Sequence, residues 1–130
     1  MSEMSSLERV VYRLLVQANI SFQQEKNFKD CYAGYYHYDF YIPSKNIIIE
    51  VNGMQHYQFT KLFHKTRSDF TKAQERDRRK ISYCLAHNIS LYIIPYWDIE
   101  NLHKVDDLFQ EKYLARDKFH NDRAWSQQKK

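Results

Sequence analysis

Three consecutive isoleucines followed by a glutamate, Ile47-Ile48-Ile49-Glu50, constrain the fold of this chain more than any other feature. A continuous β-branched run is typical of a strand buried on both faces, and such strands lie in the middle of a sheet. A carboxylate there is costly unless a cation, a metal or a hydrogen-bond donor lies beside it. The run therefore predicts a central strand that carries an acid with a specific partner.

A second strand is expected immediately before this run. Residues 38–42 are aromatic and β-branched, and residues 43–46 have the composition of a turn. The predicted antiparallel hairpin brings Asp39 and Glu50 to one end of the sheet. Two converging carboxylates can hold Mg²⁺, which activates water towards a phosphodiester. The alternative is that both acids lie on an outer face or at a strand edge.

Hydrophobic periodicity predicts the rest of the architecture. It indicates helices at 5–18, 70–87 and about 103–114, strands at 20–28 and 89–94, and a long loop at 54–69. Because a helix separates two buried strands, we expect those strands to be parallel. The expected fold is an α/β domain over residues 1–114, with a mixed central sheet of about four strands flanked by helices.

Positive charge is concentrated in two segments. Residues 60–80 hold eight basic and three acidic residues, and residues 115–130 hold five basic and two acidic residues. We expect residues 115–130 to be a polar tail that is disordered or lies on a partner. Segregated basic segments favour a polyanionic partner, and solvated protein surface is the alternative. Backbone contacts to nucleic acid are expected from Lys61, Lys65, Arg67, Lys72, Arg76, Arg78 and Arg79, a phosphate contact from His64, and base stacking from Tyr57, Phe59 and Phe63.

Several classes of protein are not expected. No apolar run approaches the roughly 20 residues of a membrane-spanning helix, and the first residues do not resemble a secretory signal. Cys31 and Cys84 lack the spacing of a zinc motif or a disulfide framework, which favours reduced thiols in a cytoplasm. The sequence also has no glycine-rich nucleotide-binding loop, so no nucleotide cofactor is expected.

Three further polar side chains are candidates for the same site. Asp77 falls in the middle of the apolar stripe of the 70–87 helix, so we expect it to face the sheet, in a site or in a buried salt bridge. His56 follows Glu50 closely and can act as a general base or acid, with a surface histidine as the alternative. Glu8 flanks the apolar stripe of the first helix, where a capping role is the alternative.

Four segments together resemble the PD-(D/E)XK nuclease superfamily: Asp39–Pro43, Ile49–Tyr57, Gln74–Lys80 and Leu91–Trp97. More narrowly, they resemble the branch that contains the very-short-patch repair endonuclease and certain phage homing endonucleases. The resemblance covers about residues 5–100. It implies a restriction-endonuclease-like core and a metal-dependent endonuclease that nicks or cuts DNA with Mg²⁺, for which Mn²⁺ substitutes. It also implies a source in a phage or mobile element and action in a bacterial or phage-infected cytoplasm.

The resemblance assigns roles to residues of this chain. Asp39 and Glu50 would bind the metal and His56 would handle the proton. Glu8 and Asp77 complete the active-site set of this branch. The chain is small, so sequence specificity would come from the basic loop, from a homodimer or from a partner protein.

One position departs from the superfamily pattern. A lysine often lies two residues after the second acid, and in this chain that residue is Asn52. His56, Gln55 or Lys80 would then supply the missing function. The alternative is a catalytically inactive subunit that keeps the nuclease fold and serves as a nucleic-acid-binding or scaffold protein.

Overall fold

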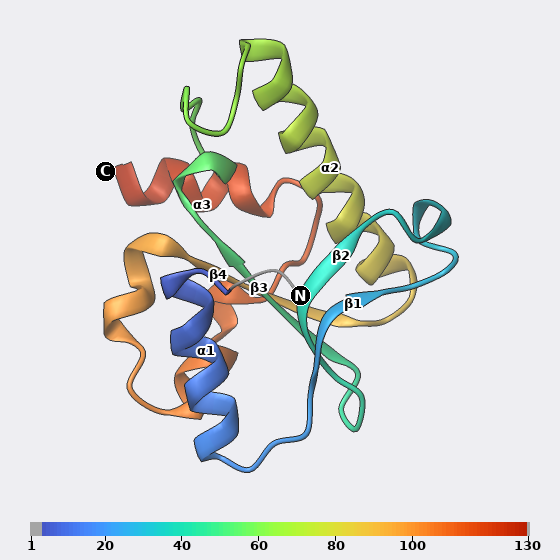
Figure 1. Cartoon of the computed structure of the whole chain (residues 1–130), viewed down its shortest axis with the longest axis vertical. Coiled ribbons are helices and arrows are strands. Elements are labelled where there is room, and N and C mark those ends of the chain that lie inside the picture. The colour runs from blue at the N-terminus through green and yellow to red at the C-terminus, as the bar shows by residue number, and fades with distance from the viewer. Residues whose placement is uncertain (1–3, 130) are drawn as a thin grey trace.

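The computed structural model describes residues 4–129 of the 130-residue chain. Its helices and strands within these residues are α1 (Ser6–Gln17), β1 (Gln23–Asn27), β2 (His37–Ile42), β3 (Ile47–Asn52), α2 (Arg67–Ala86), β4 (Ser90–Pro95) and α3 (His120–Lys129). The strands form a central sheet, α1 and α2 lie apart on either side of it, and α3 lies beside α2 (Figure 1). No helix in this part of the chain is long and apolar enough to cross a membrane.

The sheet has four strands in the order β1-β2-β3-β4. The pairs β1–β2 and β2–β3 are antiparallel, whereas β3 and β4 are parallel. The isoleucine run therefore forms an inner strand, as expected, and the mixed α/β sheet flanked by helices is confirmed. At Glu50 the backbone of β3 is paired with Ile93 of β4, which fixes the point from which the carboxylate projects.

Two hydrophobic clusters cover the faces of the sheet. Neighbouring residues of a strand point to opposite faces, so Ile49 belongs to the cluster under α1 and Ile48 to the cluster under α2. The first cluster contains Val11, Leu15, Phe40, Ile49 and Ile94, among others. The second contains Tyr38, Ile48, Ile81, Cys84 and Leu91, among others. Ile81 and Cys84 define the buried face of α2, whereas Leu85 lies beyond it and is 40% exposed.

Side-chain caps determine where the first two long helices begin. The Ser5 hydroxyl accepts a hydrogen bond from the Glu8 N–H at 3.1 Å and starts α1 as expected. Thr66 and Asp69 form a reciprocal capping box that starts α2 at Arg67, three residues before the expected position. The loop expected at 54–69 is correspondingly shorter, and it contains a 3₁₀ turn at Met54–His56.

The expected helix at 103–114 is wrong. Two short 3₁₀ helices, Val105–Phe109 and Glu111–Tyr113, occupy this region instead. The Asp107 carboxylate accepts the N–H groups of His103 and Lys104 at 2.8 and 3.0 Å, which favours a tight local turn. Gln110 has an extended backbone and separates the two turns.

The end of the chain differs from the expected disordered or partner-bound tail. Residues 120–129 form α3, which packs against the rest of the protein. Arg78 of α2 donates to both carboxylate oxygens of Asp122, at 3.1 and 3.2 Å. The Trp125 ring stacks against Tyr57 with 5.8 Å between centroids. An ion pair and an aromatic contact therefore hold this basic segment on the domain.

Candidate active site

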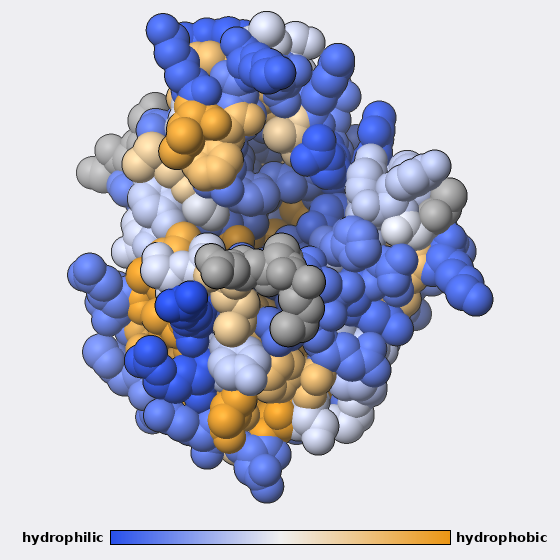
Figure 2. Space-filling view, viewed as in Figure 1, coloured by the Kyte–Doolittle hydropathy of each residue, from blue (hydrophilic) through white to orange (hydrophobic). Residues whose placement is uncertain are grey.

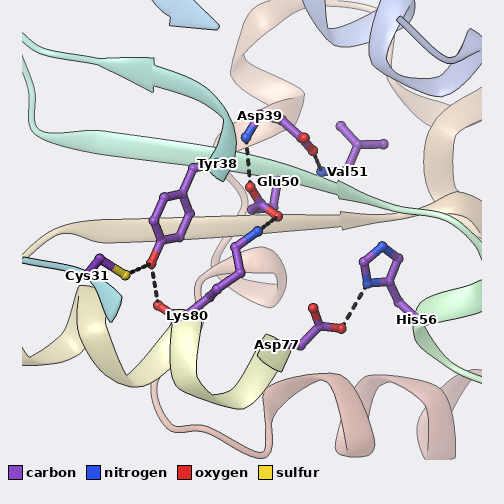
Figure 3. Close-up of polar contacts among 8 residues, drawn as sticks. All are labelled: Cys31, Tyr38, Asp39, Glu50, Val51, His56, Asp77 and Lys80. Atoms are coloured by element: carbon purple, nitrogen blue, oxygen red, sulfur yellow. Dashed lines mark hydrogen bonds and ion pairs between the residues drawn. The ribbon is translucent and has the colours of Figure 1, made fainter. Parts of the chain in front are cut away.

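The carboxylates of Asp39 and Glu50, which were predicted to converge, form the hydrogen bonds between β2 and β3 at the end where the two strands separate. Backbone pairing between these strands ends at Phe40 opposite Ile49. One position further, the Asp39 N–H donates to Glu50 Oε1 at 2.7 Å, and the Val51 N–H donates to Asp39 Oδ2 at 2.8 Å (Figure 3). Each carboxylate thus binds the opposite strand, and the exchange fixes the direction of both side chains.

The surroundings of Asp39 are strongly unfavourable for its negative charge. Burial raises the pKa of this carboxyl well above its usual range, and the nearby Glu50 and Glu8 carboxylates raise it further. The Val51 N–H and the Lys80 ammonium act in the opposite direction but do not balance these effects. Within residues 4–129, three carboxyl groups, those of Asp39, Glu50 and Glu8, thus lie near a single cation, Lys80.

Lys80 is the cation at the centre of this site. Its Nζ donates to Glu50 Oε2 at 2.9 Å and lies 4.8 Å from the centroid of the Tyr38 ring. The Tyr38 hydroxyl donates to the Lys80 backbone carbonyl at 2.9 Å, which holds this turn of α2 against the sheet. Burial lowers the pKa of the Lys80 ammonium, but the Glu50 and Asp39 carboxylates outweigh burial, so the net effect is a raised pKa.

His56 and Asp77 form a second polar pair. His56 Nδ1 lies 2.8 Å from Asp77 Oδ2, and the two side chains are 26% and 14% exposed (Figure 3). Asp77 therefore faces inward, as its place in the apolar stripe predicted, and its partner is a histidine. This contact engages Nδ1 and leaves Nε2 of the imidazole available to a water or a substrate.

A cavity of about 680 Å³ brings these groups together. Its walls include three of the four predicted acids, the histidine and the lysine of α2: Glu8, Asp39, Glu50, His56 and Lys80. Asp77, the fourth acid, lines the neighbouring groove and reaches this cavity only through His56. The Ser5 hydroxyl accepts the Glu8 N–H, as the capping alternative expected, and Glu8 also lines the cavity. Its active-site role stays a prediction. Gln55 lines the same cavity, whereas Asn52 is 3% exposed and lines a smaller one beneath it with Glu50 and Lys80.

The donor chemistry of this cavity fits Mg²⁺. In proteins, this cation takes one or two carboxylates and keeps several waters. Asp39 and Glu50 supply two such carboxylates. The pKa of Asp39 is raised first by burial and then by the Glu50 carboxylate, and a bound cation would favour its charged form. No group of three His, Cys, Asp or Glu side chains within residues 4–129 is arranged as a complete metal centre. A Mg²⁺ site made of two carboxylates and several waters does not require three such side chains.

The seven predicted basic residues fall into three groups. Lys72 and Arg76 line a groove of about 430 Å³ next to the cavity, with His56 and Phe63 between the two spaces. Figure 2 shows this hollow beside the orange patch of the loop before α2. Lys61 and Lys65 are exposed on that loop. The other three contact the protein itself: Arg78 pairs with Asp122, Arg67 lies over Phe59, and Arg79 lies over Tyr32.

Two of the expected nucleic-acid contacts are wrong. Tyr57 is 5% exposed and packs against Trp97 with 4.7 Å between ring centroids, so it cannot stack on a base. His64 is 4% exposed, accepts the Thr60 N–H at 3.1 Å and packs against Phe70, so it holds the loop together and does not reach a phosphate. Phe63, in contrast, is 60% exposed.

Asn121 was not predicted as a site residue, because it lies in the segment expected to be a tail. Its Oδ1 is buried and has no hydrogen-bond partner among the described residues. Asn121 lines the small cavity beneath the site with Glu50, Asp77 and Lys80. Helix α3 therefore forms part of the wall behind the candidate active site. A single polar residue has no sequence pattern from which this position could be predicted.

Comparison with known proteins identifies viral relatives. One is "Uncharacterized protein 307L" of Invertebrate iridescent virus 6, which is 40% identical over 58 residues. Another is "Uncharacterized protein 094L" of Frog virus 3 (isolate Goorha), which is 42% identical over 59 residues. Each match covers 45% of this chain but only 29% and 38% of the two relatives, respectively. No protein-family model matches the chain.

Proposed function

We propose that this protein is a Mg²⁺-dependent endonuclease that hydrolyses phosphodiester bonds in DNA. The observation that carries the proposal is the cavity lined by Asp39, Glu50, Lys80 and His56. Behind this lining, the His56 imidazole is bonded to Asp77, and Lys80 is bonded to Glu50. This arrangement combines a carboxylate pair, a buried cation and an oriented imidazole. The resemblance of the sequence to PD-(D/E)XK nucleases supports the same activity.

The roles of the residues follow from their contacts. Asp39 and Glu50 would hold Mg²⁺, which when bound polarises a phosphodiester and promotes attack by water. Lys80 would hold Glu50 in place and offset negative charge that develops on the phosphate. It takes over the function of the superfamily lysine, because the residue at that position, Asn52, is buried beneath the cavity.

His56 would move the proton. Its Nε2 can take a proton from the attacking water or give one to the leaving oxygen. Asp77 accepts from Nδ1 and thereby fixes the tautomer and the ring orientation, a positioning role. Lys72 and Arg76 would bind the phosphates of the strand on the far side of His56. A second copy of the chain or a partner protein would add sequence specificity.

One observation favours the second candidate, an inactive nucleic-acid-binding or scaffold subunit. Lys80 Nζ is already bonded to Glu50 Oε2, so a lysine neutralises the acid that would otherwise bind the metal. In such a protein the Lys80–Glu50 ion pair would have only a structural role. The two candidates differ in whether a divalent cation binds at Asp39.

A plasmid-cleavage assay tests the proposal. Supercoiled, linear and branched DNA are incubated with the protein in Mg²⁺, Mn²⁺ or EDTA. We expect nicking or cutting with either metal, none in EDTA, and none by Asp39→Asn. Asp106→Asn, which changes an exposed acid on a 3₁₀ helix, is the matched control and should cleave like the wild type. Retained DNA binding with no cleavage of any substrate would support the inactive subunit instead.

A further inference from the structure

The loop between β1 and β2 lies beside the C-terminal half of α2 (Figure 1). This loop carries three tyrosines, Tyr32, Tyr35 and Tyr36. Tyr35 is 79% exposed and Tyr32 is 46% exposed. The rings of Tyr32 and Tyr36 pack against each other with 4.8 Å between centroids. Large aromatic rings exposed together in this way present flat faces to a ligand.

Arg79 of α2 lies against this tyrosine patch, which we define as Tyr32, Tyr35 and Tyr36. Its guanidinium carbon is 5.8 Å from the Tyr32 ring centroid, and its Nη1 donates to the Tyr36 hydroxyl at 3.3 Å. Arg79 forms no ion pair with an acid in the part of the chain that the structure describes. Its charge is therefore available to an anion that reaches the patch.

The tyrosine patch is continuous with the candidate active site. Lys72, Arg76 and Arg79 are all exposed and are spaced four and three residues apart, so they lie along one side of α2. One acid, Glu75, interrupts this row and leaves it with a net positive charge. Seven residues of helix span about 10 Å, so the row leads from the groove beside His56 to the patch.

We infer that the tyrosine patch binds unpaired nucleotides of a nucleic-acid strand that follows the Lys72–Arg79 row away from the active site. Exposed aromatic faces with an arginine match the faces of bases and the phosphates between them. A duplex covers the faces of its bases by stacking, so only an unpaired segment can use the patch. This inference rests on the proposed function for the identity of the neighbouring site, and it names a substrate class with a single-stranded part.

Binding in the absence of metal tests the inference separately from cleavage. Fluorescence anisotropy in EDTA would measure the affinity of the full chain for labelled oligothymidine of about 12 nucleotides, for a duplex of the same length, and for an abasic strand. We expect oligothymidine to bind more tightly than the abasic strand. Tyr35→Ala and Tyr32→Ala should each weaken oligothymidine binding about 5-fold or more and leave duplex binding unchanged.

Two control variants decide the interpretation. Tyr35→Phe keeps the ring and should keep the affinity, whereas Val16→Ala changes an exposed residue of α1 outside the patch and should have no effect. Unchanged oligothymidine binding by both alanine variants, or equal binding of the abasic strand, would overturn the inference. Binding of bases by the tyrosine patch without DNA cleavage would support this inference and overturn the proposed nuclease activity. Cleavage without such binding would support the nuclease activity and overturn this inference.

Discussion

Lys80 on α2 and Glu50 on β3 form a salt bridge of 2.9 Å whose two side chains are only 14% and 11% exposed. A buried pair of this kind adds little net stability compared with apolar residues, but removing one partner leaves an uncompensated charge. The bridge therefore restrains the candidate active site and makes it sensitive to single substitutions.

Lys80→Met should lower the free energy of unfolding by about 3 kcal/mol, because Glu50 would remain buried without its cation. Urea denaturation followed by circular dichroism would measure this loss. The double variant Lys80→Met/Glu50→Gln should recover most of it. Lys45→Met, in the exposed turn between β2 and β3, is the matched control and should change little. A double variant as unstable as the single one would show that the charge is not the cause.

Asp39→Asn should abolish stabilisation by Mg²⁺ and raise thermal stability in EDTA. The amide oxygen can still accept the Val51 N–H, while the charge disfavoured by burial and by Glu50 is removed. Thermal unfolding with and without about 10 mM Mg²⁺ would measure both effects. A melting temperature of the wild-type protein that does not respond to Mg²⁺ would argue against a metal at this carboxylate.

His56→Ala should reduce cleavage by about 10²–10⁴-fold and leave DNA affinity within a few-fold of wild type. Asp77→Asn should also reduce cleavage and alter its pH dependence, because the histidine would lose the carboxylate that orients it. Steady-state cleavage across the range around neutral pH would separate the two variants. His103→Ala, an exposed histidine, is the control. Near-normal cleavage by His56→Ala would remove the imidazole from the mechanism.

Two substitutions on α2 should distinguish an arginine that contacts phosphates from an arginine with a structural role. Arg76→Gln should weaken DNA binding and reduce the slope of affinity against salt by about one counterion, because Arg76 lines the groove. Arg78→Gln should instead loosen α3, because it removes the ion pair with Asp122. Affinity at several salt concentrations, with tryptophan fluorescence as the measure of α3, would test both. Equal salt slopes for Arg76→Gln and wild type would place the strand elsewhere.

The protein should lose stability as the pH falls below about 6.5, in part through His120 at the start of α3. Burial and the nearby Arg123 lower the pKa of this imidazole, although Asp117 acts in the opposite direction. The unfolded chain then binds a proton more readily than the folded protein, so the contribution of His120 is present above the unfolded pKa and is lost at lower pH. Urea denaturation at several pH values should show that the free energy of unfolding depends less on pH in His120→Gln than in the wild type.

The central features of the fold and site could be predicted because local physical chemistry determines them. The isoleucine run required an inner strand, its turn required a hairpin, and the period of α2 placed Asp77 on the inner face. The central position of Lys80 could not be derived, because the direction of a lysine at the edge of an apolar face depends on the partner that it finds. The docking of α3 depends on contacts with Arg78 and Tyr57, which are remote in sequence and leave no periodic signal.

The exchange of hydrogen bonds between Asp39 and the backbone beside Glu50 has a consequence for the way related sequences are interpreted. These two side chains close the end of the β2–β3 hairpin by accepting N–H groups that the separated strands no longer pair. A relative that had lost its activity would still need oxygen acceptors at both positions to hold its hairpin together. Acidic residues at these positions are therefore weak evidence of catalysis, and the imidazole–carboxylate pair, which has no such duty in the sheet, is the better diagnostic of an active enzyme.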